Sequence, residues 1–327
     1  MKILRGAGIT TTVGCIALLS ACGQSDAPSG AAQTQNESVQ TQAQTPAAQP
    51  AATPAASQPD RAAQLERGRY LVETIAGCGN CHTPHNPDGT LNQEMAYAGA
   101  YVITEPEFVA YAPNITPDME TGIGSWSEED IVHALRNGIR PDGRVLGPPM
   151  SFPWYRRLSD TDAYAIAAYI KTVPAIRNEV PRSEYHIPLE GYGPIVTSVP
   201  DVPRDDPVRY GEYLAGPVGH CMDCHTTLVM GRNDMAQLGR GQNVFRQPFN
   251  MPWTAIAANI TPHEDGIGGW TDEEIKRAIT QGVSRDGRQL LPFMPFELYD
   301  DIEERDLDAI VAYLKSIPPL PTIPPAE

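Results

Sequence analysis

The chain has 327 residues, and its 40 acidic side chains outnumber the 24 basic ones, which gives a formal net charge of −16. An acidic balance of this size argues against nucleic acid as a partner and against direct electrostatic binding to an anionic membrane surface. The length is sufficient for two domains of ordinary size.

The N-terminus has the organisation of a secretion signal. Two basic residues precede an apolar stretch, residues 9–19, that is too short to cross a membrane. The sequence Leu19-Ser20-Ala21-Cys22 resembles the lipobox of bacterial lipoproteins, in which cleavage precedes a lipid-carrying cysteine. We therefore expect a signal peptide at 1–21, a lipid anchor on Cys22, and an exported, membrane-anchored protein whose folded part lies in the periplasm. The alternative is an ordinary secretory signal with an incidental cysteine.

Residues 22–59 consist largely of Ala, Gln, Thr, Ser and Pro, with almost no large apolar side chain. Such a composition buries too little surface to offset the conformational entropy that is lost on folding. We expect a disordered tether here, whose root-mean-square span would be roughly 30–35 Å.

A helix predicted from Asp60 to Ile75 leads to the motif Cys78-Gly79-Asn80-Cys81-His82, and the same pattern recurs as Cys221-Met222-Asp223-Cys224-His225. C-x-x-C-H is the attachment sequence for c-type haem. Each thiol can form a thioether with one haem vinyl group, and the histidine can ligate the iron. A zinc site is the alternative, but the cysteine pairs are 143 positions apart (221 − 78), against about 15–20 in a typical zinc module. The sequence therefore predicts two covalently bound haem c groups, attached at Cys78, Cys81, Cys221 and Cys224.

Other short sequences recur at nearly the same offset. An internal repeat of this length predicts a duplicated domain. We expect domains at 60–174 and 208–318, joined by a proline-rich, mostly extended connector at 175–207 and followed by a tail at 319–327. The recurring pairs are Asn114-Ile115-Thr116-Pro117 with Asn259-Ile260-Thr261-Pro262, Gly122-Ile123-Gly124-Ser125-Trp126 with Gly266-Ile267-Gly268-Gly269-Trp270, Pro141-Asp142-Gly143-Arg144 with Arg285-Asp286-Gly287-Arg288, and Ala168-Tyr169-Ile170-Lys171 with Ala312-Tyr313-Leu314-Lys315.

Each copy is predicted to be a few helices around one covalent haem, so the expected fold class is mainly α. Capping residues and acidic first turns mark the helix starts, glycines mark the ends, and apolar residues recur at helical spacing. The expected elements are helices from Ser127 to Gly138 and from Thr271 to Gly282, last helices over 160–173 and 303–317, and short hairpins around 98–109 and 239–253.

The sixth coordination position of each iron is predicted from the methionines. Met150 follows His82 by 68 positions (150 − 82) and Met294 follows His225 by 69 (294 − 225), and both methionines lie in proline-flanked loops. We therefore assign His82 and Met150 to one iron and His225 and Met294 to the other. His/Met ligation raises the reduction potential relative to two histidines. Histidine is a weaker candidate for the sixth ligand, because the remaining histidines have no counterpart in the other copy: His85, His133, His186, His220 and His263.

Trp126 and Trp270 occupy equivalent positions after the repeated Gly-Ile-Gly. Either indole could donate its N–H group to a haem propionate. The alternative is that both side chains pack in the core.

On these motifs the sequence resembles a tandem of class I cytochrome c domains, and more closely the cytochrome c subunits of membrane-bound bacterial alcohol and gluconate dehydrogenases. The likeness covers nearly everything from Asp60 to Pro318. Those subunits usually bind three haems, whereas this chain has two attachment motifs. The resemblance implies a non-enzymatic electron carrier that accepts electrons from a dehydrogenase and passes them to another cytochrome or a terminal oxidase. The alternative is a dihaem peroxidase with one reactive haem, which the matched methionines disfavour because that chemistry needs an open sixth position.

Overall fold

The structure is a computed structural model that describes residues 60–189, 191, 193–229 and 232–323. The predicted signal peptide, the predicted anchor Cys22 and the predicted tether lie outside these residues, as does the end of the predicted tail. Among the described helices, none is long and apolar enough to cross a membrane.

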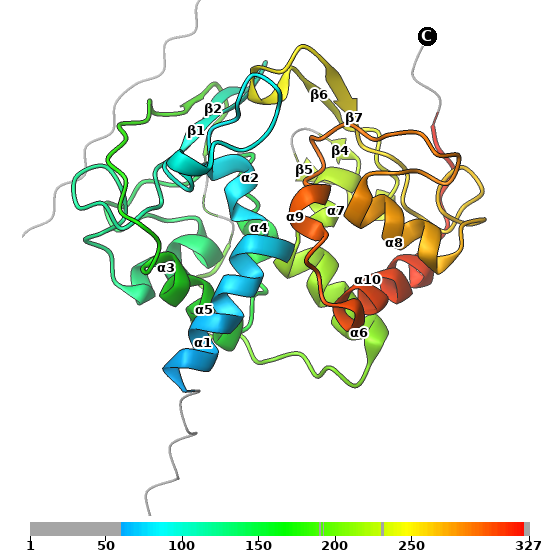
Figure 1. Ribbon diagram of the computed structural model, residues 1–327, viewed down its shortest axis with the longest axis horizontal. Helices are drawn as coiled ribbons and strands as arrows, with labels where there is room; N and C mark the ends of the chain where they lie inside the picture. Colours follow the sequence, from blue (N-terminus) through cyan, green and yellow to red (C-terminus); the bar gives the residue numbers. More distant parts are fainter. Residues whose placement is uncertain (1–59, 190, 192, 230–231, 324–327) are drawn as a thin grey trace, which may run out of the picture. The chain divides into compact units, whose positions relative to one another are not determined.

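The N-terminal half, residues 60–189, is built mainly from helices beside one small antiparallel sheet (Figure 1). The connector contributes the third strand of this sheet, because β3 pairs with β2. In chain order the elements are α1 (Arg61–Tyr70), η1 (Leu71–Ile75, a π-helix), α2 (Cys78–His82), η2 (Gln93–Met95), β1 (Ala100–Glu105), β2 (Phe108–Ala112), α3 (Glu128–Asn137), α4 (Phe152–Tyr155), α5 (Asp160–Ile170) and β3 (Glu184–Tyr185).

The C-terminal half, residues 207–323, repeats this order of elements. Its hairpin of β6 and β7 corresponds to β1 and β2, and β4 and β5 form a further two-stranded sheet. The elements are α6 (Pro207–Tyr213), η3 (Leu214–Val218, a π-helix), α7 (Cys221–His225), β4 (Leu228–Val229), β5 (Arg232–Asn233), η4 (Met235–Gln237), β6 (Val244–Arg246), η5 (Pro248–Asn250), β7 (Thr254–Ile256), α8 (Asp272–Gln281), α9 (Phe296–Tyr299) and α10 (Glu304–Ser316).

The predicted helix ends are confirmed by their capping geometry. The side chains of Ser127 and Thr271 each accept a hydrogen bond from the backbone N–H three residues later. In both capping boxes the acidic side chain of that later residue accepts a hydrogen bond from the backbone N–H of the capping residue. Helices α3 and α8 stop at Gly138 and Gly282, which adopt left-handed φ angles of 65° and 64°. A hairpin is present at both predicted places, but the predicted ends are too early: the second strand continues to Ala112 in the first hairpin and lies wholly beyond residue 253, at Thr254–Ile256, in the second.

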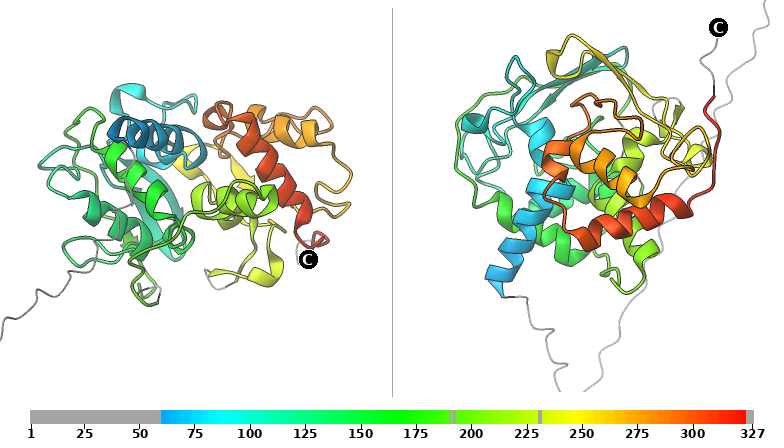
Figure 2. Two further views of the ribbon diagram at one scale, coloured as in Figure 1. Left: turned by 90° about the horizontal axis from the view of Figure 1, so that it is seen from below. Right: turned by 45° about the vertical axis from the view of Figure 1, so that its right-hand side comes forward.

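One close helix crossing occurs in each half. Helix α1 lies against α5, and α6 lies against α10 (Figures 1 and 2). The crossing depends on Gly68 and Gly211, because a Cβ atom would lie 2.0 Å from the carbonyl oxygen of Ala165 at the first position and 1.8 Å from that of Ala309 at the second. Close approach of two backbones therefore explains the glycine shared by Gly68-Arg69-Tyr70-Leu71 and Gly211-Glu212-Tyr213-Leu214.

The hydrophobic core is continuous between the two halves. Leu71 and Val72 of η1 belong to the same buried cluster as Leu214 and Val218 of η3, and all four are fully buried. Burial of one such side chain contributes about 1.5–3 kcal/mol to the free energy of folding. The described residues accordingly belong to a single compact unit by their contacts, within which the two sets of elements pack directly on each other.

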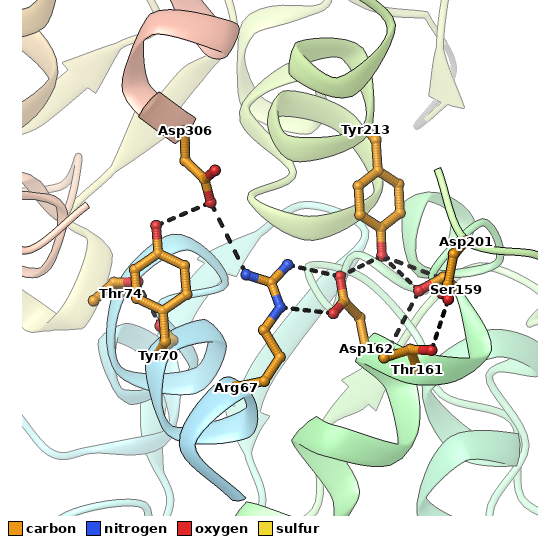
Figure 3. Close-up of polar contacts among 9 residues, drawn as sticks. All are labelled: Arg67, Tyr70, Thr74, Ser159, Thr161, Asp162, Asp201, Tyr213 and Asp306. Atoms are coloured by element: carbon orange, nitrogen blue, oxygen red, sulfur yellow. Dashed lines mark hydrogen bonds and ion pairs between the residues drawn. The ribbon is translucent and has the colours of Figure 1, made fainter. Parts of the chain in front are cut away.

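A polar network around Arg67 also joins the halves (Figure 3). Two nitrogens of Arg67 donate to the carboxylate of Asp162 over 2.8 and 2.9 Å, and a third lies 3.9 Å from Asp306 of the C-terminal half. The Tyr213 hydroxyl donates to Asp162 over 2.7 Å, and the Tyr70 hydroxyl donates to Asp306 over 3.1 Å. Each half thus supplies a tyrosine to the buried aspartate of the other half.

The reciprocity extends to the backbone. The Tyr213 hydroxyl accepts from the N–H of Ser159, and the Tyr70 hydroxyl accepts from the N–H of Glu303 at the equivalent position. The exception is Arg67 itself, whose counterpart is Tyr210. One half-buried arginine therefore lies near two buried aspartates, and this asymmetry distinguishes the two carboxylates.

Candidate haem-binding sites

The two attachment motifs form single-turn helices that start in the same unusual way. Helix α2 follows Gly77 with a φ of 53°, and α7 follows His220 with a φ of 41°. One turn of helix places residues three positions apart on the same face, so both thiols of each motif share one side. All four cysteines are free, and burial raises the pKa of Cys78 to about 12 and that of Cys221 to about 11.

His82 and His225 are held identically by a backbone carbonyl. The Nδ1 atom of His82 lies 2.8 Å from the Pro113 oxygen, and that of His225 lies 2.8 Å from the Ala258 oxygen. Burial lowers the pKa of both imidazoles, against a smaller opposing effect of the carbonyl. A neutral ring with Nδ1–H donating to a carbonyl leaves Nε2 as a free lone pair, which is the form a metal requires.

These carbonyl acceptors were not identified from the sequence. They immediately precede the repeated Asn-Ile-Thr-Pro, and this motif explains their position. Asn114 accepts from the N–H of Thr116 over 2.9 Å, and its amide donates to the Ile176 oxygen over 2.7 Å. Asn259 makes the equivalent contacts with Thr261 and with the Leu320 oxygen, at 2.9 and 2.8 Å. The motif thus fixes the loop that carries the acceptor to the segment after the last helix of each half.

Both motifs open into one cavity of about 2010 Å³. Its lining includes both cysteine pairs, His82, His225, Met150 and Met294. Cavities for a single small molecule usually measure about 300–1,000 Å³, so this space suits two large groups. The structure therefore brings all eight predicted attachment and ligand residues to one place, and their bonding to haem stays a prediction.

Met150 and Met294 lie in the loops just before α4 and α9 and are half-buried against the core. The Tyr185 hydroxyl donates to the Pro148 oxygen over 3.0 Å and so fastens the Met150 loop to the connector. Of the other described histidines, only His220 also lines the cavity. His85 stacks on Phe249 at 3.9 Å, and burial lowers the pKa of His85 to about 4.

The two repeated tryptophans differ. Trp126 lines the cavity, whereas Trp270 lies by a small surface hollow with Arg285. The guanidinium of Arg140 stacks over Trp126 at 4.9 Å.

Arginines gather on the cavity wall of the N-terminal half. Arg140, Arg144 and Arg182 all line the cavity, and burial followed by repulsion from Arg144 lowers the pKa of Arg140. The buried Nε atom of Arg140 has no hydrogen-bond partner among the described residues, and the nearest carboxylate, that of Asp142, is 3.7 Å away. A buried, unsatisfied cationic donor on a cavity wall fits an anionic group such as a haem propionate.

Comparison with known proteins agrees with this geometry. Residues 65–174 match the family model described as cytochrome c, so the chain contains a cytochrome c domain. The chain is 32% identical to the cytochrome c subunit of alcohol dehydrogenase (quinone) from Gluconobacter oxydans, over 79% of this chain and 56% of the relative. It is 31% identical to the fructose dehydrogenase cytochrome subunit of Gluconobacter japonicus, over 78% of this chain and 52% of the relative.

A third relative is named as a diheme cytochrome c-type protein from Cereibacter sphaeroides, which is 25% identical over 80% of this chain and 90% of the relative. The chain spans about half the length of the two dehydrogenase subunits it matches. The resemblance to cytochrome c subunits of bacterial dehydrogenases that the motifs indicate is therefore confirmed.

Proposed function

We propose that this protein is a dihaem c-type cytochrome that transfers electrons from a periplasmic or membrane dehydrogenase to a respiratory acceptor, either another cytochrome or a terminal oxidase. The observation that carries the proposal is the duplicated support of His82 and His225 by a carbonyl at 2.8 Å. Haem c bound at each motif would supply an iron that alternates between ferrous and ferric states and so carries one electron at a time. The names of the relatives, cytochrome subunits of alcohol and fructose dehydrogenases, support the class of donor.

In this proposal ten residues of the cavity have defined roles. Cys78, Cys81, Cys221 and Cys224 would form the thioethers, His82 and His225 would offer Nε2 to the irons, and Met150 and Met294 would supply the other protein ligands. Arg140 and Arg144 would compensate propionate charge in the N-terminal half. A thioether ligand raises the reduction potential and closes the sixth position. Because both halves bring a methionine to the cavity, a dihaem peroxidase is not proposed.

The proposal assigns one haem to each of two cytochrome c domains, at 60–174 and 208–318. It also includes export, removal of residues 1–21, and anchoring to a membrane through lipid on Cys22, with 22–59 as a tether to the periplasmic domains. The lipobox-like sequence and the apolar stretch at 9–19 support this part.

The test is expression in a bacterium that attaches haem c, followed by haem quantification per chain. We expect two covalent haems in the parent protein and one in each of the double variants Cys78→Ala/Cys81→Ala and Cys221→Ala/Cys224→Ala. Mixing the reduced protein with oxidised membranes should reoxidise both haems. One haem in the parent protein, or rapid carbon monoxide binding by one reduced haem at neutral pH, would contradict the proposal.

A further inference from the structure

The attachment helix of each half lies next to the methionine loop of the other half. Helix α4, which follows Met150, packs on η3 before the second motif, and α9, which follows Met294, packs on η1 before the first. The two contacts occupy equivalent positions in the repeat. Their chemistry is nevertheless different.

The contact to the Met150 loop is made by hydrogen bonds to Asp223, the residue before Cys224. The Ser151 hydroxyl donates to Asp223 Oδ2 over 2.7 Å, and the Trp154 indole N–H donates to Oδ1 over 3.2 Å. Asn233 completes the arrangement, since its amide donates to the Asp223 carbonyl over 2.9 Å and its oxygen accepts from Trp154 over 3.1 Å. The Asp223 carboxylate is thereby satisfied by the other half of the molecule.

Ser151 is used in an unexpected way. It is the residue before α4 and directly follows Met150, where a serine side chain ordinarily accepts from the N–H groups of its own helix. No such capping bond is present, and the hydroxyl, in a side chain that is buried, donates instead across to Asp223. A local capping role is therefore replaced by a contact between the halves.

The reciprocal contact is apolar. Ser151 corresponds to Pro295, Trp154 to Leu298 and Asp223 to Asn80. At Gly77 a Cβ atom would lie 3.6 Å from a Leu298 methyl carbon and 3.9 Å from the Pro295 ring. The Met294 loop thus meets the first attachment motif through ordinary packing.

We propose that Asp223 is a positioning residue for Met150: the attachment helix of the C-terminal half holds the methionine ligand of the N-terminal half through the hydroxyl of Ser151. The inference rests on the proposed ligand role of Met150. Its consequence is a one-way dependence. Met150 depends on hydrogen bonds from its loop to the C-terminal half to stay in position, whereas Met294 has no equivalent dependence on hydrogen bonds to the N-terminal half.

The experiment compares Ser151→Ala with Asp223→Ala in the full-length dihaem protein, with Asn80→Ala as the matched control at the equivalent position. Imidazole competes with a methionine ligand for ferric iron, so its apparent affinity reports how firmly the methionine is held. The methionine methyl signals shifted by each haem in proton NMR, assigned with Met150→Ala and Met294→Ala, identify the site.

We expect both Ser151→Ala and Asp223→Ala to raise the imidazole affinity at the Met150 site about tenfold, the size expected for one lost bond to a charged acceptor. Asp223→Asn, which keeps an acceptor oxygen, should restore most of the parent behaviour, and Asn80→Ala should change neither site. If Asp223→Ala impairs haem attachment, Ser151→Ala still tests the positioning role, because Ser151 lies outside both attachment motifs.

An unchanged imidazole affinity in Ser151→Ala, or equal changes at both sites, would overturn the positioning role alone. If Met150→Ala leaves both methionine signals in place, the ligand assignment of the proposed function fails, and this inference fails with it.

Discussion

In the N-terminal half the connector lines the cavity and pairs with the edge of the sheet, whereas in the C-terminal half the equivalent edge carries exposed apolar side chains. Strand β3 pairs with β2, and the Ser183 hydroxyl exchanges hydrogen bonds with the backbone of Tyr111. Strand β7 has only β6 as a described partner, and Ile256, which corresponds to Tyr111, is 66% exposed. Arg140 of the first half corresponds to Ser284 of the second.

The comparison shows how two sets of elements in the same order can surround two unequal sites. The shared parts are backbone features: the Gly-dependent helix crossing, the capping boxes, and the carbonyl that supports each histidine. The parts that differ are side chains around the cavity, whose charge and packing set the electronic environment of a bound metal. Variants at equivalent positions therefore separate the effects of the shared backbone features from the effects of the side chains that differ between the two sites.

The largest expected effect is at the shared helix crossing. Gly68→Ala and Gly211→Ala should each lower the free energy of unfolding by about 3 kcal/mol, because a methyl group would overlap a carbonyl oxygen that cannot move without shifting a helix. Denaturant unfolding of both variants checks this. Gly143→Ala is the control, since a Cβ atom there meets nothing within 4 Å, and its positive φ of 81° should cost only about 1 kcal/mol. A loss no greater than that of the control would show that the crossing adjusts freely.

The backbone features that the two halves share could be predicted from the sequence, because the residues that indicate them lie close to them in the chain. Capping residues, helix-ending glycines and the C-x-x-C-H motifs lie within a few residues of the structure they specify. What the sequence did not reveal is the contact between halves. Ser151 and Asp223 are 72 positions apart (223 − 151), and nothing near either residue indicates that a capping serine would bond to an attachment helix. The different surroundings of Trp126 and Trp270 were also missed, because they depend on Arg140 and Arg285, which lie outside the repeated tryptophan motif.

Removal of the connector's aromatic side chain should cost more stability than removal of an exposed side chain on strand β7. Tyr185→Ala is expected to lower the free energy of unfolding by about 2 kcal/mol, because the ring covers Gly147 and its hydroxyl donates to the Pro148 oxygen. Tyr185→Phe, which keeps the ring, should cost about 1 kcal/mol. In the C-terminal half, Ile256→Ala should stay within about 0.5 kcal/mol of the parent protein, as is usual for an exposed position. Equal losses at both positions in denaturant unfolding would mean that the two edges are equally covered.

The charge difference at the cavity predicts a difference in potential. Arg140→Gln should lower the reduction potential of the haem proposed at the first attachment motif by about 60 mV, which is a tenfold change in the one-electron equilibrium constant, because a nearby positive charge disfavours the ferric state. Ser284→Arg should raise the potential of the haem proposed at the second motif. Spectroelectrochemical titration of both variants measures these shifts. An unchanged N-terminal potential in Arg140→Gln would show that Arg140 does not act on the iron.

The last comparison distinguishes two equivalent aspartates by pH, and the change expected at Asp306 is the smallest of the set. Burial raises the pKa of Asp306, against the opposing charge of Arg67, so this carboxyl binds a proton more readily in the folded chain than in the unfolded one. Its contribution to stability is therefore complete below the unfolded pKa of about 4 and is lost as the pH rises through the higher folded value. Asp306→Asn removes this titration, so the variant should gain stability relative to the parent protein between acidic and neutral pH.

Asp162 is the matched position, and the opposite result is expected there. Its carboxylate forms the bidentate pair with Arg67 and accepts from Tyr213, so Asp162→Asn leaves a half-buried arginine poorly paired. That change should cost about 3 kcal/mol at neutral pH. Guanidinium unfolding of both variants at several pH values measures the difference. If Asp306→Asn loses stability relative to the parent protein as the pH rises, Arg67 serves both carboxylates equally, and the asymmetry of the network has no energetic consequence.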